Sequence, residues 1–358
     1  MRKVELIFLF LVCMSIASFL PNSLWAAVTG PCGTCHTMHN SQGGEGLGGS
    51  PATHLTKGGC IGCHTGTNDG SNVIPYVYSE SEPTYGTDTL AGGNFWWVAT
   101  DGGGNDTKGH NVLGLSNQDT NILTSEGAPG GWIGCSNSCH ETLAAAQTAV
   151  PDYGSGCEGC HLAVKHHKND HPDGNYDNVV GEDGGWFRYC SGHMSGVGNG
   201  VEGIEDQDWQ YSNSASDHNE YLGNVVAHTE NGGFYNIGNT MTAYCCGCHG
   251  GFHQENSATG SLWVRHPSDA VIPSGGEYAA YTEYDPLAPV ARPTLTDSAP
   301  SSTVTPGTDL VMCLSCHRAH GSPYADMLRW DYADGTFAGG GGAADGTGCF
   351  VCHTEKDD

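Results

Sequence analysis

The apolar residues of this chain form one long run, at its beginning, and are scattered thinly afterwards. The run occupies residues 6–20 and follows two basic residues. It is typical of a secretory signal with cleavage near Ala26 or Ala27. A retained membrane anchor is the weaker interpretation, because the run is short for a bilayer span. The pattern therefore predicts a signal peptide over 1–26 and a secreted chain over 27–358 with no membrane span.

Only short regular elements are predicted in the remainder of the chain. Aromatic and β-branched residues at 73–78 and 94–100 predict two short strands. The alanines of 142–150 predict a helix that Pro151 ends. Residues 288–307 are rich in Pro, Ser and Thr and predict an extended surface linker. Gly, Asn, Asp and Ser dominate the other long segments and favour turns.

Composition makes an ordinary side-chain core difficult to build. A chain of 358 residues normally buries a large core, but 55 of these residues are glycine. The formal net charge is −27, so nucleic acid and anionic lipid are poor partners. Cationic partners, metal ions and oxidised minerals suit this field better.

A motif of two cysteines followed at once by a histidine occurs seven times. Two thiols at this spacing reach both vinyl groups of one haem, and the adjacent imidazole then meets the iron, which is the c-type attachment signature. The third copy has three residues between its cysteines instead of two, a spacing that still permits attachment. The attachment cysteines are Cys32, Cys35, Cys60, Cys63, Cys135, Cys139, Cys157, Cys160, Cys245, Cys248, Cys313, Cys316, Cys349 and Cys352. The proximal histidines are His36, His64, His140, His161, His249, His317 and His353.

Zinc and disulfides are the alternatives for these cysteines, and both explain less. A histidine that directly follows the second cysteine cannot share a tetrahedral zinc with both thiols. A disulfide framework explains neither the histidines nor the repeated spacing. We therefore predict seven covalently bound haems c. The predicted fold class is mostly coil with short helices, in a single heptahaem domain whose core is a stack of closely packed haems.

The second axial ligand decides between electron transfer and catalysis, because an open iron binds substrate and a bis-histidine iron does not. Twelve histidines lie outside the motifs, more than the seven that are needed. The candidates for distal ligands are His39, His110, His166, His193, His218, His253, His266 and His320. The sequence does not decide between His166 and His167, nor does it assign His54, His171 or His228.

Three of these candidates follow a proximal histidine by three or four residues. His39, His253 and His320 would therefore lie on the same face of a helical turn as the proximal ligand. A side chain on that face cannot reach the far side of the same porphyrin. If these histidines bind iron, each must bind the iron of a different haem.

Two further features of the sequence have more than one interpretation. Cys190 and Cys246 lie outside the attachment pattern and are either a disulfide or free thiols. The acidic stretches 101–106 and 202–208 offer ligands that calcium prefers, although solvated loops are the simpler interpretation.

The order of these motifs resembles the extracellular multihaem cytochromes of metal-reducing bacteria that polymerise into conducting filaments. The resemblance covers 31–64 and 243–358, and the fourth motif and the stretch that follows it depart from the six-haem pattern of that family. It rests on Cys35-His36-Thr-Met-His39-Asn-Ser, Gly109-His-Asn, His249 with His253, Arg265-His-Pro and Cys313-Leu-Ser-Cys-His-Arg-Ala-His320. It implies bis-histidine ligation throughout, a continuous haem stack, and a histidine at the position of His39 that reaches a haem of the next subunit.

The leading functional hypothesis is electron transfer, not enzymatic catalysis, by an extracellular or cell-surface protein. The chain would then be a head-to-tail homopolymer that exchanges electrons with redox proteins or extracellular acceptors. A monomeric periplasmic shuttle and a multihaem reductase with one open iron are the alternatives. The sequence does not identify the donor, the acceptor, or the order and potentials of the haems.

Overall fold

The computed structural model describes about three fifths of the chain, and the signal-peptide prediction lies outside this part. The described residues are 30–42, 45–47, 55–71, 74–122, 142–146, 155–162, 164, 166–167, 179–180, 187–191, 200–225, 239–249, 266–295, 300–332 and 348–355. Within these ranges no helix is long and apolar enough to cross a membrane.

The helices are short, and many of them coincide with the cysteine motifs. Among the described residues, two are α-helices, α2 (Cys60–His64) and α3 (Met241–His249). Single 3-10 turns make up the rest: η1 (Cys32–Thr34), η2 (Phe95–Trp97), η3 (Asp106–Lys108), η4 (Gly156–Gly159), η5 (Phe187–Tyr189), η8 (Gly276–Tyr278), η9 (Cys313–Ser315), η10 (Ala325–Met327) and η11 (Gly348–Val351). The predicted class, mostly coil with short helices, is confirmed.

In the described part of the chain, the strands are two or three residues long and form two small sheets. In the first, β1 (Ser41–Gln42) pairs antiparallel with β2 (Glu45–Gly46). The second has the order β3-β4-β5-β7-β8-β6, and only β5 and β7 pair in parallel. Its strands are β3 (Val179–Val180), β4 (Gly203–Ile204), β5 (Glu220–Leu222), β6 (Ala270–Val271), β7 (Ala291–Arg292) and β8 (Leu310–Val311).

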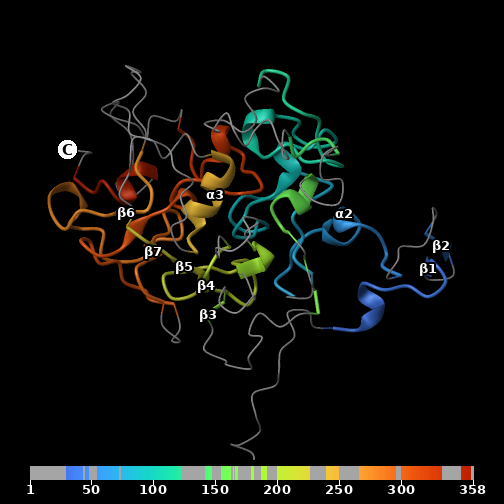
Figure 1. Cartoon of the computed structure of the whole chain (residues 1–358), viewed down its shortest axis with the longest axis horizontal. Helices are drawn as coiled ribbons and strands as arrows, with labels where there is room; N and C mark the ends of the chain where they lie inside the picture. Colours follow the sequence, from blue (N-terminus) through green and yellow to red (C-terminus); the bar gives the residue numbers. More distant parts are fainter. Residues whose placement is uncertain are drawn as a thin grey trace, which may run out of the picture.

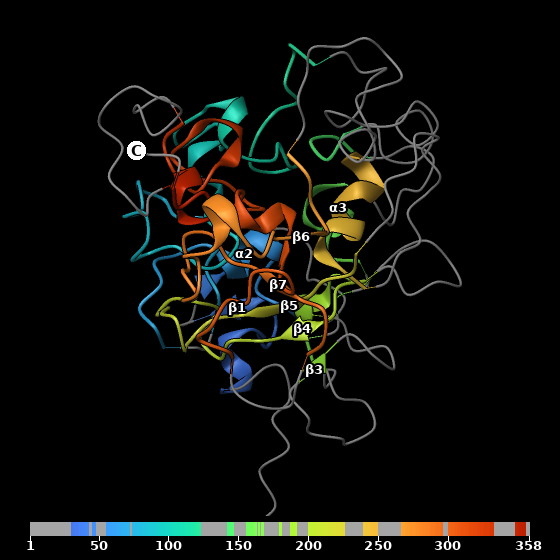
Figure 2. The same cartoon turned by 90° about the vertical axis from the view of Figure 1, so that its left-hand side faces the viewer.

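Side chains do form compact clusters, although the composition argued against an ordinary core. One cluster joins Met241 of α3 to Tyr221 of β5 and Leu310 of β8, so α3 packs on the six-stranded sheet (Figure 2). A second joins Val351 of η11 to Tyr281. These clusters hold the cysteine motifs against the sheet and the loops around it.

The predicted surface linker at 288–307 is wrong. It contains β7, which lies inside the sheet, and Ala291 is completely buried. Arg292 explains the burial: its guanidinium bonds to Glu220 at 3.1 Å and to Asp309 at 2.5 Å, and all three side chains are buried. A paired, hydrogen-bonded charge of this kind can be buried, and here it ties the segment to the sheet.

The other predicted elements also differ from the structure. Residues 94–100 contain the 3-10 turn η2 and no strand, because the Asn94 side chain accepts a hydrogen bond from the Trp96 amide and caps a helical turn. In the described part of 73–78, only Tyr78 makes a bridge, to Thr65. Residues 142–146 form a turn instead of the predicted helix, and the rest of that segment lies outside the described residues.

The cysteine motifs are distributed along the long axis of the molecule. In Figure 1, β1 and β2, which follow the first motif, lie at one end, and β6 lies toward the other. The last motif belongs to that second end, because Val351 packs on Ile272, directly after β6.

Candidate haem-binding sites

Each described motif folds as one helical turn that brings its cysteines and its histidine together. The histidine amide donates a hydrogen bond to the carbonyl of the first cysteine, for example from His36 to Cys32 at 2.9 Å and from His161 to Cys157 at 2.8 Å. Residues four apart on a helical turn share a face. The two thiols and the imidazole are thus held as c-type attachment requires. The third motif, Cys135 to His140, lies outside the described residues.

Five of the six described motif histidines face a histidine from another part of the chain. The ring centres are 6.0–6.3 Å apart in every pair. The pairs are His36 with His167, His64 with His166, His161 with His320, His249 with His110, and His353 with His266.

This spacing fits two imidazoles on opposite sides of one metal ion. An imidazole nitrogen binds a metal at about 2.0–2.1 Å, and its ring centre lies about 1.1 Å behind that nitrogen, so the two centres would be about 6.3 Å apart. The angles between the ring planes range from 14° to 86°. In packed aromatic rings, the distance between the ring centres varies with the angle between the ring planes. A metal ion bound by two nitrogens instead fixes the distance between the ring centres and leaves each ring free to rotate about its metal–nitrogen bond. The residues present therefore fit a six-coordinate haem iron.

Backbone carbonyls orient the imidazoles. The Nδ1 atoms of His64, His110 and His317 lie 2.8, 2.6 and 2.7 Å from the carbonyl oxygens of Pro75, Ala319 and Asp326, respectively. A proton on Nδ1 that bonds to a carbonyl leaves Nε2 free to bind a metal. This is the arrangement that axial histidine ligands adopt.

Burial keeps these imidazoles neutral, which metal binding requires. Desolvation lowers the pKa of His64, His110 and His161. For His320, burial, followed by the charges of His161 and His110, lowers the pKa to about 3. These side chains are therefore unprotonated on one nitrogen at neutral pH.

The position of His320 depends on a close approach of backbone. A Cβ atom at Gly92 would lie 2.8 Å from Nδ1 of His320, and the His320 amide donates to the Gly92 carbonyl at 2.7 Å. The His320 ring also stacks on Phe95 with centres 4.8 Å apart. These contacts turn His320 toward His161. His161 belongs to the fourth motif, whereas His317, which is close to His320 in the chain, belongs to the sixth.

Consecutive described motifs contact one another in chain order. The Lys57 amide, just before the second motif, donates to the Cys35 carbonyl at 2.9 Å. The Cys60 and Cys157 thiols are hydrogen-bonded, and so are the thiols of Cys245 and Cys313. The Tyr244 hydroxyl, just before the fifth motif, donates to the Cys160 carbonyl. Val311, just before the sixth motif, packs in the same apolar cluster as Val351 of the seventh. The attachment turns therefore form one file through the molecule.

Two predicted distal candidates lie elsewhere. His218 is completely buried, its ring stacks on Tyr284 with centres 3.5 Å apart, and its Nδ1 lies 3.1 Å from the Ser214 carbonyl. His39 is exposed on the turn after the first motif and has a positive φ of 59°.

His193, His253, His54, His171 and His228 lie outside the described residues. The adjacent pair His166 and His167 was predicted to provide one ligand, but both rings face motif histidines. In the sequence, the signal for two ligands here was the adjacent pair of histidines itself, which lies between two lysines.

The described residues also include the two extra cysteines and the two acidic stretches that the sequence left open. Cys190 and Cys246 are free thiols, so the disulfide alternative is not present. Cys190 Sγ lies 3.6 Å from Nδ1 of His161. The described residues, which include both acidic stretches, contain no group of three or more carboxylate, thiol or imidazole side chains suited to a metal ion.

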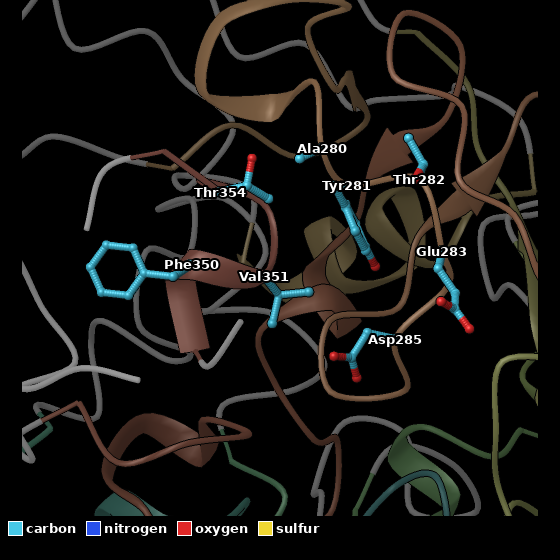
Figure 3. A pocket seen from close by; sticks show the side chains of 8 residues that line it. All are labelled: Ala280, Tyr281, Thr282, Glu283, Asp285, Phe350, Val351 and Thr354. Atoms are coloured by element: carbon cyan, nitrogen blue, oxygen red, sulfur yellow. The ribbon is translucent and has the colours of Figure 1, made fainter. Parts of the chain in front are cut away.

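A surface cavity of about 370 Å³ lies beside the last attachment turn. Figure 3 shows the carboxylates of Glu283 and Asp285 on one side of it and Phe350 pointing away on the other. No histidine is among the residues that line this cavity.

Both a protein-family model and a known protein are similar in sequence to this chain. A family model described as a doubled CXXCH motif matches residues 306–358, which contain the last two motifs. The C-type cytochrome OmcS of Geobacter sulfurreducens is 27% identical over 84% of this chain and 79% of its own length. The chain resembles a multihaem cytochrome. The resemblance stated from the sequence is confirmed, and the chain carries covalently bound c-type haem.

Two solved structures also match. The Outer Membrane Cytochrome S filament from Geobacter sulfurreducens has a TM-score of 0.46 and 21% identity, over 86% of this chain and 85% of that one. The cryo-EM structure of the OmcS nanowires from the same organism has a TM-score of 0.41 and 21% identity, over 93% and 92%.

Proposed function

We propose that this protein transfers electrons outside the cell through seven bis-histidine haems c, as the repeating subunit of a filament. The observation that carries the proposal is the set of five imidazole pairs with a constant separation and variable angle. Each pair joins a motif histidine to a histidine of another segment. Two strong ligands on each iron leave no position for a substrate, so the arrangement suits electron transfer and not catalysis.

The ligand assignments follow from these pairs. His167 and His166 complete the haems of the first and second motifs, and His320, His110 and His266 complete those of the fourth, fifth and seventh. His317 of the sixth motif faces no imidazole within the described part of the chain. His39, His193 and His253 are the remaining predicted ligands for this haem and for that of the third motif.

The file of attachment turns supplies the electron path. Each described motif contacts the next one, so the haems they hold are neighbours in chain order. Haem supplies the one-electron chemistry, and the protein fixes the spacing and the axial ligands. An electron that enters at one end can then move through the molecule without a mobile carrier.

Assembly into a filament extends this path. The matched relative OmcS occurs as nanowires. The first and last motifs of this chain lie toward opposite ends of the molecule, which permits head-to-tail contact and an open filament. The net charge of −27 opposes self-association, so a metal–ligand bond across the contact would offset the repulsion.

The stoichiometry is tested by intact mass. We expect the secreted protein to lack the residues before Ala26 or Ala27 and to carry seven haems. A mass with six haems would point first to Cys135 and Cys139, because their wider spacing makes attachment hardest there. A mass with fewer than six would contradict the proposed cofactor content.

Electron microscopy of the native protein tests the assembly. The proposal expects filaments with a repeat of one subunit. Single particles at high concentration would favour the periplasmic shuttle and would contradict the filament.

A further inference from the structure

One of the paired imidazoles faces a carboxylate. Nδ1 of His353 lies 3.1 Å from Oε1 of Glu277, and both side chains are 21% exposed. This nitrogen is shielded from solvent and has no aligned hydrogen-bond partner in the structure. The Glu277 carboxylate is thus within hydrogen-bond distance of the His353 Nδ1 atom.

The other imidazoles with a described Nδ1 contact face neutral backbone carbonyls. The Nδ1 of His266, which is opposite His353 in its pair, lies 2.9 Å from the Pro267 carbonyl. In His161 the nearest acceptor is the Arg188 carbonyl at 3.1 Å. A full negative charge at this position therefore distinguishes His353 from the imidazoles that face backbone carbonyls.

The structure around Glu277 holds its carboxylate in place. Thr354 Oγ1 donates a hydrogen bond to the Glu277 carbonyl at 2.7 Å, which links the turn η8 to the residue after His353. Tyr278 donates its hydroxyl to the Glu277 side chain, and its ring lies 4.9 Å from the His353 ring. These contacts fix both partners of the pair.

A carboxylate on Nδ1 makes the imidazole a stronger electron donor than a carbonyl does. Stronger donation stabilises the ferric state and lowers the reduction potential, since axial-ligand electronics and nearby hydrogen bonds set that potential. The negative charge of the Glu277 carboxylate also stabilises the ferric state and so also lowers the reduction potential.

We propose that Glu277 is a positioning residue that lowers the reduction potential of the haem at His353. This inference rests on the proposed function, because it requires a haem at the seventh motif. That haem lies at one end of the file. In a head-to-tail filament, this lowered potential would then recur at each junction between subunits and affect the energetic step there.

The test is a redox titration of the whole haem-loaded protein with Glu277→Gln. Glutamine keeps the size and offers a neutral acceptor, as the carbonyls do at the other sites. We expect one of the seven one-electron components to rise by about 59 mV, a tenfold change in the ferric-to-ferrous ratio at fixed potential. The other six components should stay in place, and the axial-ligand bands of one haem should change in the low-temperature spectrum.

Glu283→Gln is the matched control, because Glu283 is on the same segment and faces the cavity in Figure 3. It removes the same charge without removing a partner of His353. Glu277→Asp keeps the charge and shortens its reach, so it should give a smaller rise and serves if Glu277→Gln fails to fold.

The outcomes separate the inference from the proposed function. Seven components with none displaced in either Glu277 variant would overturn the role of Glu277 alone. An equal rise in Glu283→Gln would also overturn it, since charge and not the contact would be responsible. A protein without seven reversible one-electron components would instead contradict the proposed function.

Discussion

Replacing His39 with alanine should give secreted protein with all its haems attached, one of them high-spin, and no filaments. His39 is exposed on the turn after the first motif, next to β1 at one end of the molecule (Figure 1). Its own proximal histidine, His36, already faces His167. A ligand at this exposed end is therefore suited to complete a haem of another subunit.

The matched control for His39→Ala is Met38→Ala. Met38 is the preceding residue and is 74% exposed, so its loss tests surface contact without loss of a ligand. We expect Met38→Ala to form filaments with wholly low-spin haem, as judged by electron microscopy and absorption spectra. Filaments of normal length from His39→Ala would show that this histidine does not join the subunits.

Replacing His320 with alanine should open the haem of the fourth motif and leave the haem of the sixth unaffected. The His320 ring centre is 6.2 Å from that of His161, whereas His317, the motif histidine three residues before His320, belongs to the sixth motif. Loss of one axial imidazole should convert one haem in seven from low-spin to high-spin. Added imidazole should restore the low-spin spectrum by binding the open position.

The identity of the opened haem can be determined with attachment variants. In a background without Cys157 and Cys160, the high-spin signal of His320→Ala should disappear because the affected haem is absent. In a background without Cys313 and Cys316, the signal should persist. The opposite pattern would mean that His320 serves its own motif's haem, and the same-face argument would be wrong.

The sequence was most informative where chemistry depends on local spacing. The cysteine motifs indicate attachment because thiols and imidazole must meet one porphyrin, and the six described motifs do form the required turns. The spacing between His317 and His320 likewise excluded a shared iron, and the structure turns His320 toward another motif.

The sequence was less informative where long-range contacts decide the conformation. Residues 288–307 have the composition of a linker, but Arg292 is tied to two acidic residues that are distant in the chain. Asn94 caps a turn and so overrides the strand tendency of the aromatic residues after it. The separate partners of His166 and His167 depend on where two other motifs lie, and no local pattern contains that information.

The central claim is that every iron has two axial ligands, and resonance Raman spectroscopy of the native assembled protein tests it most directly. The spin-state marker bands report coordination at every haem at once. The account predicts six-coordinate low-spin haem only. A five-coordinate high-spin population of about one haem in seven, counted against the seven motifs, would contradict it and favour a reductase with an open iron.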